Sequence, residues 1–212
     1  MKLYYNPLST YSQKVLIALY EKGVPFEPSV VDLFSPESRA AFERVTPIGK
    51  VPFLKDGDWD MPESTSIIEY LEDTCPGTPR LIPPEGGEAA RQVRFIDRMA
   101  DLYLNEPIAE LLFQKVGFRP KDEVKAARMA RYANASYEAC NRRLARQPWL
   151  CGARITMADC AAIPPLYYAQ SAFPFSDYPH LAAYVQRALQ RPSYARVRAE
   201  FEPIWNGLMS RA

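Results

Sequence analysis

The chain has 212 residues, of which 48% are hydrophobic, and its formal net charge at pH 7 is +1. A chain of this length can bury the cores of two packed domains, of about 80 and 120 residues. The near-neutral charge gives no electrostatic reason to expect nucleic acid as a partner. No apolar run approaches the ~18 residues of a membrane span, and the first residues form a strand pattern instead of a signal peptide, so we expect no membrane partner and a cytoplasmic protein.

The cysteine and histidine content gives no sign of a metal site. Cys75, Cys140, Cys151 and Cys160 form no Cys-x-x-Cys pair, and His180 is the single histidine. A usual zinc set therefore cannot be completed. We expect no metal, and we interpret the cysteines as reduced, small hydrophobic residues.

Strands and helices alternate in the first third of the chain. The pattern predicts strands at 3–5 and 26–31, helices ending at 22 and running from 35 to 45, a hairpin of strands 51–55 and 58–61, and a helix at 64–74. Alternating strands and helices imply that the first two strands pair in parallel, and Asp56-Gly57 between two short strands is typical of a hairpin turn. The first helix is amphipathic, with charged residues opposite its apolar face: Lys14, Glu21 and Lys22.

The rest of the chain is predicted to be helical after a linker rich in proline and glycine. We expect domains at 1–76 and 88–212, with the linker at 77–87, and helices at 88–113 (bent near Pro107), 121–146, 156–172, 179–190 and 193–207. The arginines from Arg128 to Arg146 stand in a chain of near-neutral total charge and predict a solvated helix face instead of a phosphate-binding track. The predicted fold is βαβαββα followed by an all-α domain.

Several polar residues stand at predicted helix starts. Ser9 precedes the first helix, where its hydroxyl and the free N–H groups of the first turn can hold a thiolate or phosphate, or where it serves as an ordinary N-cap. Glu63 and Ser64 precede a later helix and leave the same two readings open. Thr156 and Asp159 form a Thr-x-x-Asp start that predicts the structural cap of a buried helix.

These segments together resemble the cytosolic glutathione S-transferases over essentially the whole chain. Residues 9–19 are similar to the serine-type active-site segment of the theta, phi, delta and zeta classes, of which this chain resembles a bacterial member. Residues 49–52 resemble the family's cis-proline loop, and Glu63-Ser64 resembles its glutathione-binding pair. Residues 149–152 with 156–159 resemble its buried capping motif, and residues 179–181 with 191–192 its C-terminal region.

The resemblance implies a thioredoxin-like first domain, a homodimer and glutathione as co-substrate. It implies that Ser9 is catalytic and donates a hydrogen bond to the glutathione sulfur, which favours the thiolate. It also implies two sets of binding residues. Those for glutathione are Lys50, Val51, Pro52, Glu63 and Ser64, and our candidates for the electrophile pocket are Tyr11, Phe34, Tyr103 and Phe113.

The sequence also departs from some members of the family. Tyr11 stands where the zeta class, which includes maleylacetoacetate isomerases, has a cysteine, and Ser9 stands where the omega and beta classes have one. Both differences count against isomerase and thiol-reductase activity. We therefore expect a glutathione transferase that conjugates small hydrophobic electrophiles in detoxification. The alternative is a non-catalytic ligand carrier or protein-interaction module of the same fold.

Overall fold

The structure is a computed structural model, and residues 1–84 and 86–210 are described. A four-stranded sheet is formed by β1 (Lys2–Tyr5), β2 (Glu27–Val30), β3 (Phe53–Asp56) and β4 (Trp59–Pro62), in the order β2-β1-β3-β4. As predicted, β1 is parallel to β2, and β3 and β4 form an antiparallel hairpin. Pro28 lies in β2 at the edge of the sheet, where its missing N–H does not interrupt the pairing.

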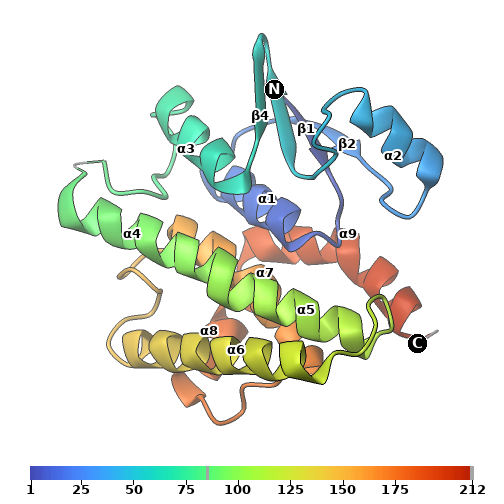
Figure 1. The fold of residues 1–212 in the computed structure, drawn as a ribbon. Helices are drawn as coiled ribbons and strands as arrows, with labels where there is room; N and C mark the ends of the chain where they lie inside the picture. The colour runs from blue at the N-terminus through green and yellow to red at the C-terminus, as the bar shows by residue number, and fades with distance from the viewer. Residues whose placement is uncertain (85, 211–212) are drawn as a thin grey trace.

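Helices cover both faces of this sheet (Figure 1). They are α1 (Thr10–Lys22), α2 (Pro36–Glu43) and α3 (Ser64–Thr74). Phe42 of α2 packs with Val31 and Phe53 in a small cluster on one face. On the other face, Leu3 and the apolar residues of α1 and α3 join a core that continues into the helical part. The predicted fold class is confirmed, with the order βαβαββα followed by helices alone.

The helical part lies on the far side of α1 from the sheet (Figure 1). It consists of α4 (Gly87–Met99), a π-helical segment η1 (Ala100–Asn105), α5 (Glu106–Lys115), α6 (Glu123–Leu144), α7 (Met157–Ala172), α8 (Pro179–Leu189) and α9 (Pro192–Met209). The predicted bend near Pro107 is replaced by η1, which ends just before that residue. Pro107 itself lies in the first turn of α5, where its missing N–H costs no hydrogen bond.

The charged face of α1 is buried and not solvated. Lys14 is 1% exposed and Lys22 is 2% exposed. Lys22 Nζ lies 2.8 Å from Glu72 Oε1, and Glu21 accepts hydrogen bonds from Arg191 Nε and Ser193 Oγ. Charged side chains are rarely buried unless they are paired. The polar face of α1 therefore contacts other elements of the fold through ion pairs instead of facing solvent.

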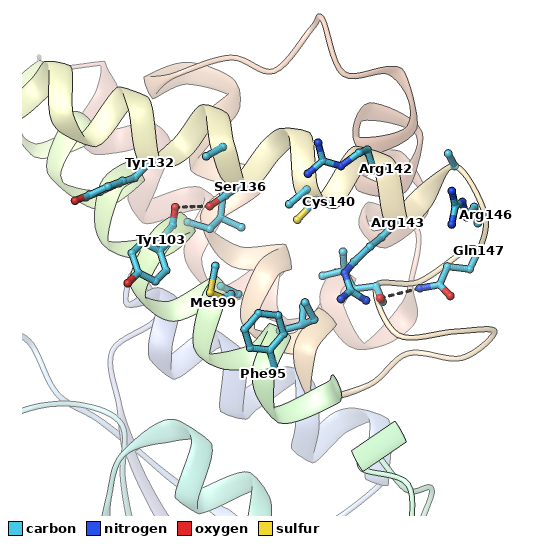
Figure 2. Close-up of a pocket in the computed structure, with 17 residues that line it drawn as sticks. Phe95, Met99, Tyr103, Tyr132, Ser136, Cys140, Arg142, Arg143, Arg146 and Gln147 are labelled. Carbon is cyan, nitrogen blue, oxygen red and sulfur yellow. Dashed lines mark hydrogen bonds between the residues drawn. The ribbon is translucent and has the colours of Figure 1, made fainter. Parts of the chain in front are cut away.

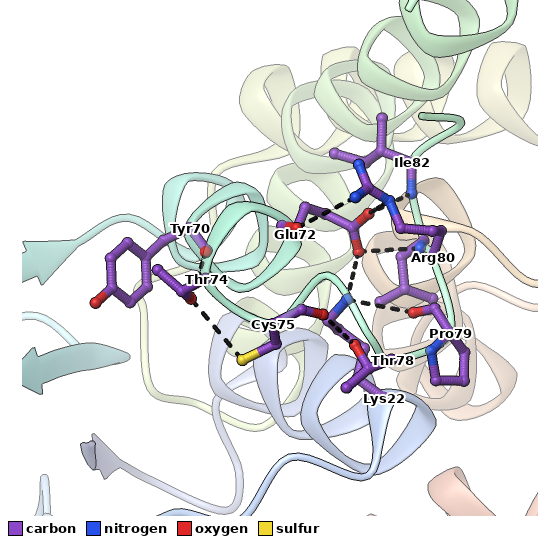
Figure 3. A network of polar contacts seen from close by, with 10 residues as sticks. Lys22, Tyr70, Glu72, Thr74, Cys75, Thr78, Pro79, Arg80 and Ile82 are labelled. Atoms are coloured by element: carbon purple, nitrogen blue, oxygen red, sulfur yellow. Dashed lines mark hydrogen bonds and ion pairs between the residues drawn. The ribbon is translucent and has the colours of Figure 1, made fainter. Parts of the chain in front are cut away.

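Glu72 of α3 holds the beginning of the linker, as Figure 3 shows. Its carboxylate pairs with Lys22 and with Arg80 Nε at 2.8 Å, and accepts from the backbone N–H groups of Leu81 and Ile82 at 3.0 and 3.4 Å. The carboxylate is therefore fully partnered although Glu72 is only 2% exposed. This network fixes the path of the chain between α3 and α4.

Candidate active site

The register of the sheet brings three predicted site segments to one end of it. Tyr4 near the end of β1 pairs with Phe53 at the start of β3, and Phe53 pairs with Pro62 at the end of β4. The loop to Ser9, the segment before Phe53 and the residues after Pro62 therefore leave the sheet at the same end. The first helical turns of α1 and α3 begin there.

Ser9 is the N-cap of α1. Its Oγ accepts a hydrogen bond from the Ser12 backbone N–H at 3.3 Å. A serine hydroxyl has one proton to donate in addition to its acceptor lone pairs. The capping role and a donor role toward a ligand are therefore compatible in this geometry.

The Val51-Pro52 peptide is cis, as the resemblance implied. Neither backbone polar group of Val51 is hydrogen-bonded to another residue of the described chain. Pro52 is buried, and the side chain of the preceding Lys50 is exposed to solvent.

Glu63 has an unusual backbone conformation at the start of α3. Its φ is 75°, and within the described residues it is the one non-glycine with a positive φ. Such a conformation costs about 1–3 kcal/mol and is found preferentially at functional sites. The Glu63 side chain makes no capping hydrogen bond, so the capping reading fails for this residue and the first N–H groups of α3 have no side-chain cap. Ser64 follows and is 5% exposed.

A buried ion cluster fixes this end of α3 against the helical part. Lys14 Nζ lies 2.8 Å from Asp97 Oδ1, 2.8 Å from Asp101 Oδ2 and 2.8 Å from Thr65 Oγ1. Thr65 in turn donates to Asp97 Oδ2 at 2.7 Å. Burial and the neighbouring Asp97 raise the pKa of Asp101, while Lys14 opposes this shift. Because Thr65 directly follows Ser64, the cluster holds the uncapped helix end in place.

A cavity of about 380 Å³ opens beside Ser9, between the two parts of the chain. The predicted pocket residues Tyr11, Phe34 and Phe113 line it, together with Ser9 itself. Its other walls are largely apolar side chains from the loop after β2, from α5 and the loop that follows it, and from α9, among them Leu33, Ile108, Leu112, Phe118, Trp205 and Leu208. The cavity can therefore hold a small apolar molecule within reach of Ser9.

Tyr11 provides a polar point in this apolar cavity. Its hydroxyl donates to Glu106 Oε1 at 2.9 Å. Burial, with the negative charges of Glu106 and Asp101, raises the pKa of Tyr11. The hydroxyl therefore stays protonated at physiological pH and is a hydrogen-bond donor.

The fourth predicted pocket residue, Tyr103, lies elsewhere. It lines a separate groove of about 900 Å³ between α4, η1 and α6. Figure 2 shows Tyr103 beside Met99, Phe95 and Tyr132, with Arg142, Arg143 and Arg146 toward the other end. The sequence predicted one continuous α-helix over 88–113 and gave no sign of the π-helical turns of η1. It therefore could not show whether Tyr103 would face the cavity or the groove.

Cys140, Cys151 and Cys160 have the character of buried thiols. All four are free, and burial raises the pKa of both Cys140 and Cys151 to about 12. They are therefore protonated at neutral pH and poor nucleophiles. Within residues 1–84 and 86–210 no cluster of three His, Cys, Asp or Glu side chains is arranged to hold a metal ion, and none of the helices described there could span a bilayer.

Asp159 caps α7 inside the helical part. Its carboxylate accepts from the backbone N–H groups of Leu150 and Thr156 at 2.9 and 2.8 Å. It also accepts from the hydroxyls of Thr156 and Tyr184, at 2.9 and 3.1 Å. Burial raises the pKa of Asp159 to about 6, against the lowering effect of these four donors. Asp159 does not line the cavity beside Ser9, and its contacts are those of a helix cap.

Sequence reasoning did not find several residues around the site. Asn105, Glu106, Tyr168 and Trp205 line the cavity, yet they stand far apart from the motifs that identify Ser9. Their positions follow from how α5, α7 and α9 pack, which no local pattern encodes. The adjacent Tyr167-Tyr168 pair gave no sign of which ring would face the cavity.

Comparison with known proteins places this architecture in a known class, a small α/β domain with a thioredoxin-like order of elements joined to an all-helical domain. A family model described as "Glutathione S-transferase, N-terminal domain" matches residues 3–79, and one described as "Glutathione S-transferase, C-terminal domain" matches residues 123–187. A glutathione S-transferase of Silene vulgaris is 32% identical, over 94% of this chain and 97% of that protein.

Two further comparisons agree. A probable maleylacetoacetate isomerase of Vibrio cholerae is 29% identical, over 92% of this chain and 94% of that protein. The crystal structure of glutathione transferase F7 from Populus trichocarpa superimposes with a TM-score of 0.81 at 26% identity, over 93% of this chain and 97% of that one. The chain belongs to the glutathione S-transferase family of enzymes.

Proposed function

We propose that the protein conjugates the thiolate of glutathione to small hydrophobic electrophiles. The observation that carries this proposal is the position of Ser9, in the wall of an apolar cavity and at the same end of the sheet as the uncapped α3. One molecule can bind at the sheet end while a second occupies the cavity. The Ser9 hydroxyl stands where the two would meet.

The Ser9 hydroxyl acts on the sulfur. It donates a hydrogen bond to the thiolate, and a hydrogen bond to a charged group is worth about 1.5–3 kcal/mol, or roughly one to two units of thiol pKa. The thiol loses its proton to solvent, and the sulfur electron pair then forms a bond to the electrophilic carbon. The leaving group departs with the electrons of the bond that breaks.

The sheet end supplies groups for the rest of glutathione. We propose that the Glu63 carboxylate pairs with the γ-glutamyl ammonium, and that Ser64 and the first N–H groups of α3 hold the γ-glutamyl carboxylate. The backbone of Val51, next to Pro52, pairs with the cysteinyl unit in the manner of an added strand. Lys50, exposed on the same loop, meets the glycyl carboxylate.

Conjugation fits the cavity better than the isomerisation suggested by the name of the Vibrio cholerae relative. Tyr11 stands where the resemblance places a zeta-class cysteine, and its hydroxyl is bound to Glu106. The surface of the walls that surround it is mostly apolar, and the cation that lines the cavity, Arg119, is already paired with Glu110. The proposed substrate is therefore a small, largely apolar electrophile.

A binding and rate measurement tests the proposal. The protein should bind glutathione at or below millimolar concentration by calorimetry, and it should accelerate the reaction of glutathione with a chlorodinitrobenzene. A protein that binds hydrophobic ligands but neither binds glutathione nor accelerates conjugation would instead be a carrier.

Replacement of Glu63 by glycine should separate stability from binding. Glycine adopts positive φ without strain, so the variant should be more stable by up to ~1 kcal/mol after the entropy cost of glycine. Loss of the carboxylate should raise the KM for glutathione about tenfold. Denaturant unfolding and KM for Glu63→Gly are compared with Glu63→Ala, which should raise KM equally without the gain in stability. An unchanged KM in both variants would remove Glu63 from the binding site.

We also propose a homodimer that uses the groove of Figure 2. Phe95 and Tyr103 line this groove and are 53% and 39% exposed, and clustered exposed apolar side chains mark protein interaction sites. Trp59 on the β3–β4 hairpin is 65% exposed between two aspartates, and so has apolar and acidic character complementary to the aromatic and arginine side chains of the groove. In a twofold dimer each first domain would face the helical domain of its partner. Sedimentation as a monomer at micromolar concentration would contradict this arrangement.

Within this proposal, residues 1–76 bind glutathione and residues 88–212 supply most of the electrophile site, joined by the linker 77–87. Dissociation of the proposed dimer would leave each candidate active site intact, because Ser9 and the residues that line the cavity belong to the same chain. A cytoplasmic location stays a prediction, which cell fractionation would test.

A further inference from the structure

The peptide that precedes Ser9 is held at both of its polar ends. The Ser9 N–H donates to the Asn6 C=O at 3.0 Å. The Leu8 C=O, in the same peptide, accepts from the Tyr168 hydroxyl at 3.2 Å. A peptide is planar, so these two bonds fix the plane of the Leu8–Ser9 unit. That plane, together with the Ser9 φ of −74°, sets the direction in which the Ser9 side chain leaves the backbone.

The peptide before it is held in the same way. The Leu8 N–H donates to Asn6 Oδ1 at 2.9 Å, and the Pro7 C=O accepts from Gln13 Nε2 at 2.8 Å. Gln13 Nε2 also donates to the Tyr168 hydroxyl oxygen at 3.0 Å. The Tyr168 hydroxyl therefore accepts a hydrogen bond from Gln13 and donates one to the Leu8 C=O. Its single proton is thus directed at Leu8.

Tyr168 differs from the other partners in its origin. Asn6 and Gln13 belong to the β1–α1 segment that carries Ser9, whereas Tyr168 comes from α7 in the helical part. Its ring lines the cavity and packs edge-on against Trp205 with the ring centroids 4.9 Å apart. Burial raises the pKa of Tyr168, so the hydroxyl remains a donor over the physiological range.

We infer that Tyr168 is a positioning residue for Ser9. It does not reach the reacting sulfur; it holds the Leu8 carbonyl so that the Ser9 hydroxyl is directed at the thiolate. The Tyr168 ring also lines the cavity. One side chain therefore contacts both the proposed electrophile site and the loop that carries Ser9. This inference rests on the proposed function, in which Ser9 stabilises the glutathione thiolate.

The test removes one hydroxyl and keeps the ring. Tyr168→Phe should lower kcat about fivefold, the effect expected for the loss of one neutral hydrogen bond, and leave the KM for glutathione unchanged. The pKa of the enzyme-bound thiol, followed by the ultraviolet absorbance of the thiolate, should rise by roughly half a unit or more. A purely structural role would not move this pKa at a temperature where the variant is folded.

The chain offers a matched control in the adjacent residue. The Tyr167 hydroxyl donates to Glu202 Oε1 at 2.9 Å, and Tyr167 does not line the cavity. Tyr167→Phe should leave both kcat and the thiol pKa unchanged. Equal effects of the two substitutions would overturn the assignment.

A double-mutant cycle shows whether Tyr168 acts through Ser9. With Ser9→Ala already present, Tyr168→Phe should cause no further rise of the thiol pKa. The same rise in both backgrounds, or a wild-type thiol pKa in the single variant, would overturn the inference. A failure of the proposed function would give a different result: Ser9→Ala alone would leave the thiol pKa unchanged.

A second variant keeps the test decisive if Tyr168→Phe does not fold. Gln13→Leu removes the donor to Pro7 and to Tyr168, and it also removes a buried Gln13 Oε1 that has no partner within the described chain. It should also raise the thiol pKa, because the Tyr168 hydroxyl then loses the donor that directs its proton toward the Leu8 carbonyl. A wild-type value in this folded variant would overturn the inference.

Discussion

Replacement of Ser9 by alanine is expected to lower kcat about 10- to 100-fold while the affinity for glutathione stays nearly unchanged. In the proposed mechanism the hydroxyl donates one hydrogen bond to a charged sulfur, and the loss of about 1.5–3 kcal/mol corresponds to this range. The groups proposed to bind glutathione at the uncapped end of α3 are untouched by the substitution. Steady-state kinetics with calorimetry of glutathione binding measure both effects.

The pH dependence gives an independent readout of the same substitution. In the wild type at saturating glutathione, kcat should rise with pH up to the lowered pKa of the bound thiol and then level off. In Ser9→Ala the midpoint should move toward the free-thiol value of about 8.5. Ser9→Thr, which keeps a hydroxyl, should retain more activity than alanine. A Ser9→Ala variant with wild-type rate and midpoint would show that another donor stabilises the thiolate.

Replacement of Asp159 by alanine is expected to have the largest effect on stability, a loss of about 4 kcal/mol. The carboxylate accepts from two buried backbone N–H groups and two hydroxyls, and each buried donor left unpaired costs about 1–3 kcal/mol. Part of this loss is recovered where the hydroxyls rotate to other acceptors. Chemical denaturation of the two proteins measures the difference.

The control for this prediction is a solvent-exposed aspartate of the same part of the chain. Asp177 is exposed, and Asp177→Ala should change the free energy of unfolding by less than about 0.5 kcal/mol. Asp159→Asn, which keeps the shape but turns one acceptor into a donor, should fall between the two. Equal stability of Asp159→Ala and wild type would mean that the buried donors find other partners.

Elements with local sequence signals were predicted well. The helix at 64–74 coincides with α3, and the Asp56-Gly57 turn joins β3 to β4 as expected. Turn chemistry and hydrophobic periodicity act within a few residues, so the sequence shows them directly. Ser9 was chosen as a candidate in the same way, because a hydroxyl at a helix start is visible without knowledge of the fold, and the structure shows it as the N-cap of α1.

Features that depend on tertiary packing were missed. Lys14 stands on the polar face of its helix, and only the approach of α4 and η1 turns that face into a buried ion cluster. The π-helical segment has no proline within it, although Pro107 suggested the place of an irregularity. Tyr168 became part of the site because α7 brings its hydroxyl to the serine loop from 160 residues away.

The buried cluster around Lys14 bears on how far the two halves of the chain can be exchanged. Its cation comes from the sheet-bearing half, and Asp97 and Asp101 come from the helical half. A chimera that joined either half to that of a relative without the matching charge would bury an ion with no counterion, at a cost of about 3–5 kcal/mol. Recombination between members of the family is therefore restricted to parents that share both sides of this cluster.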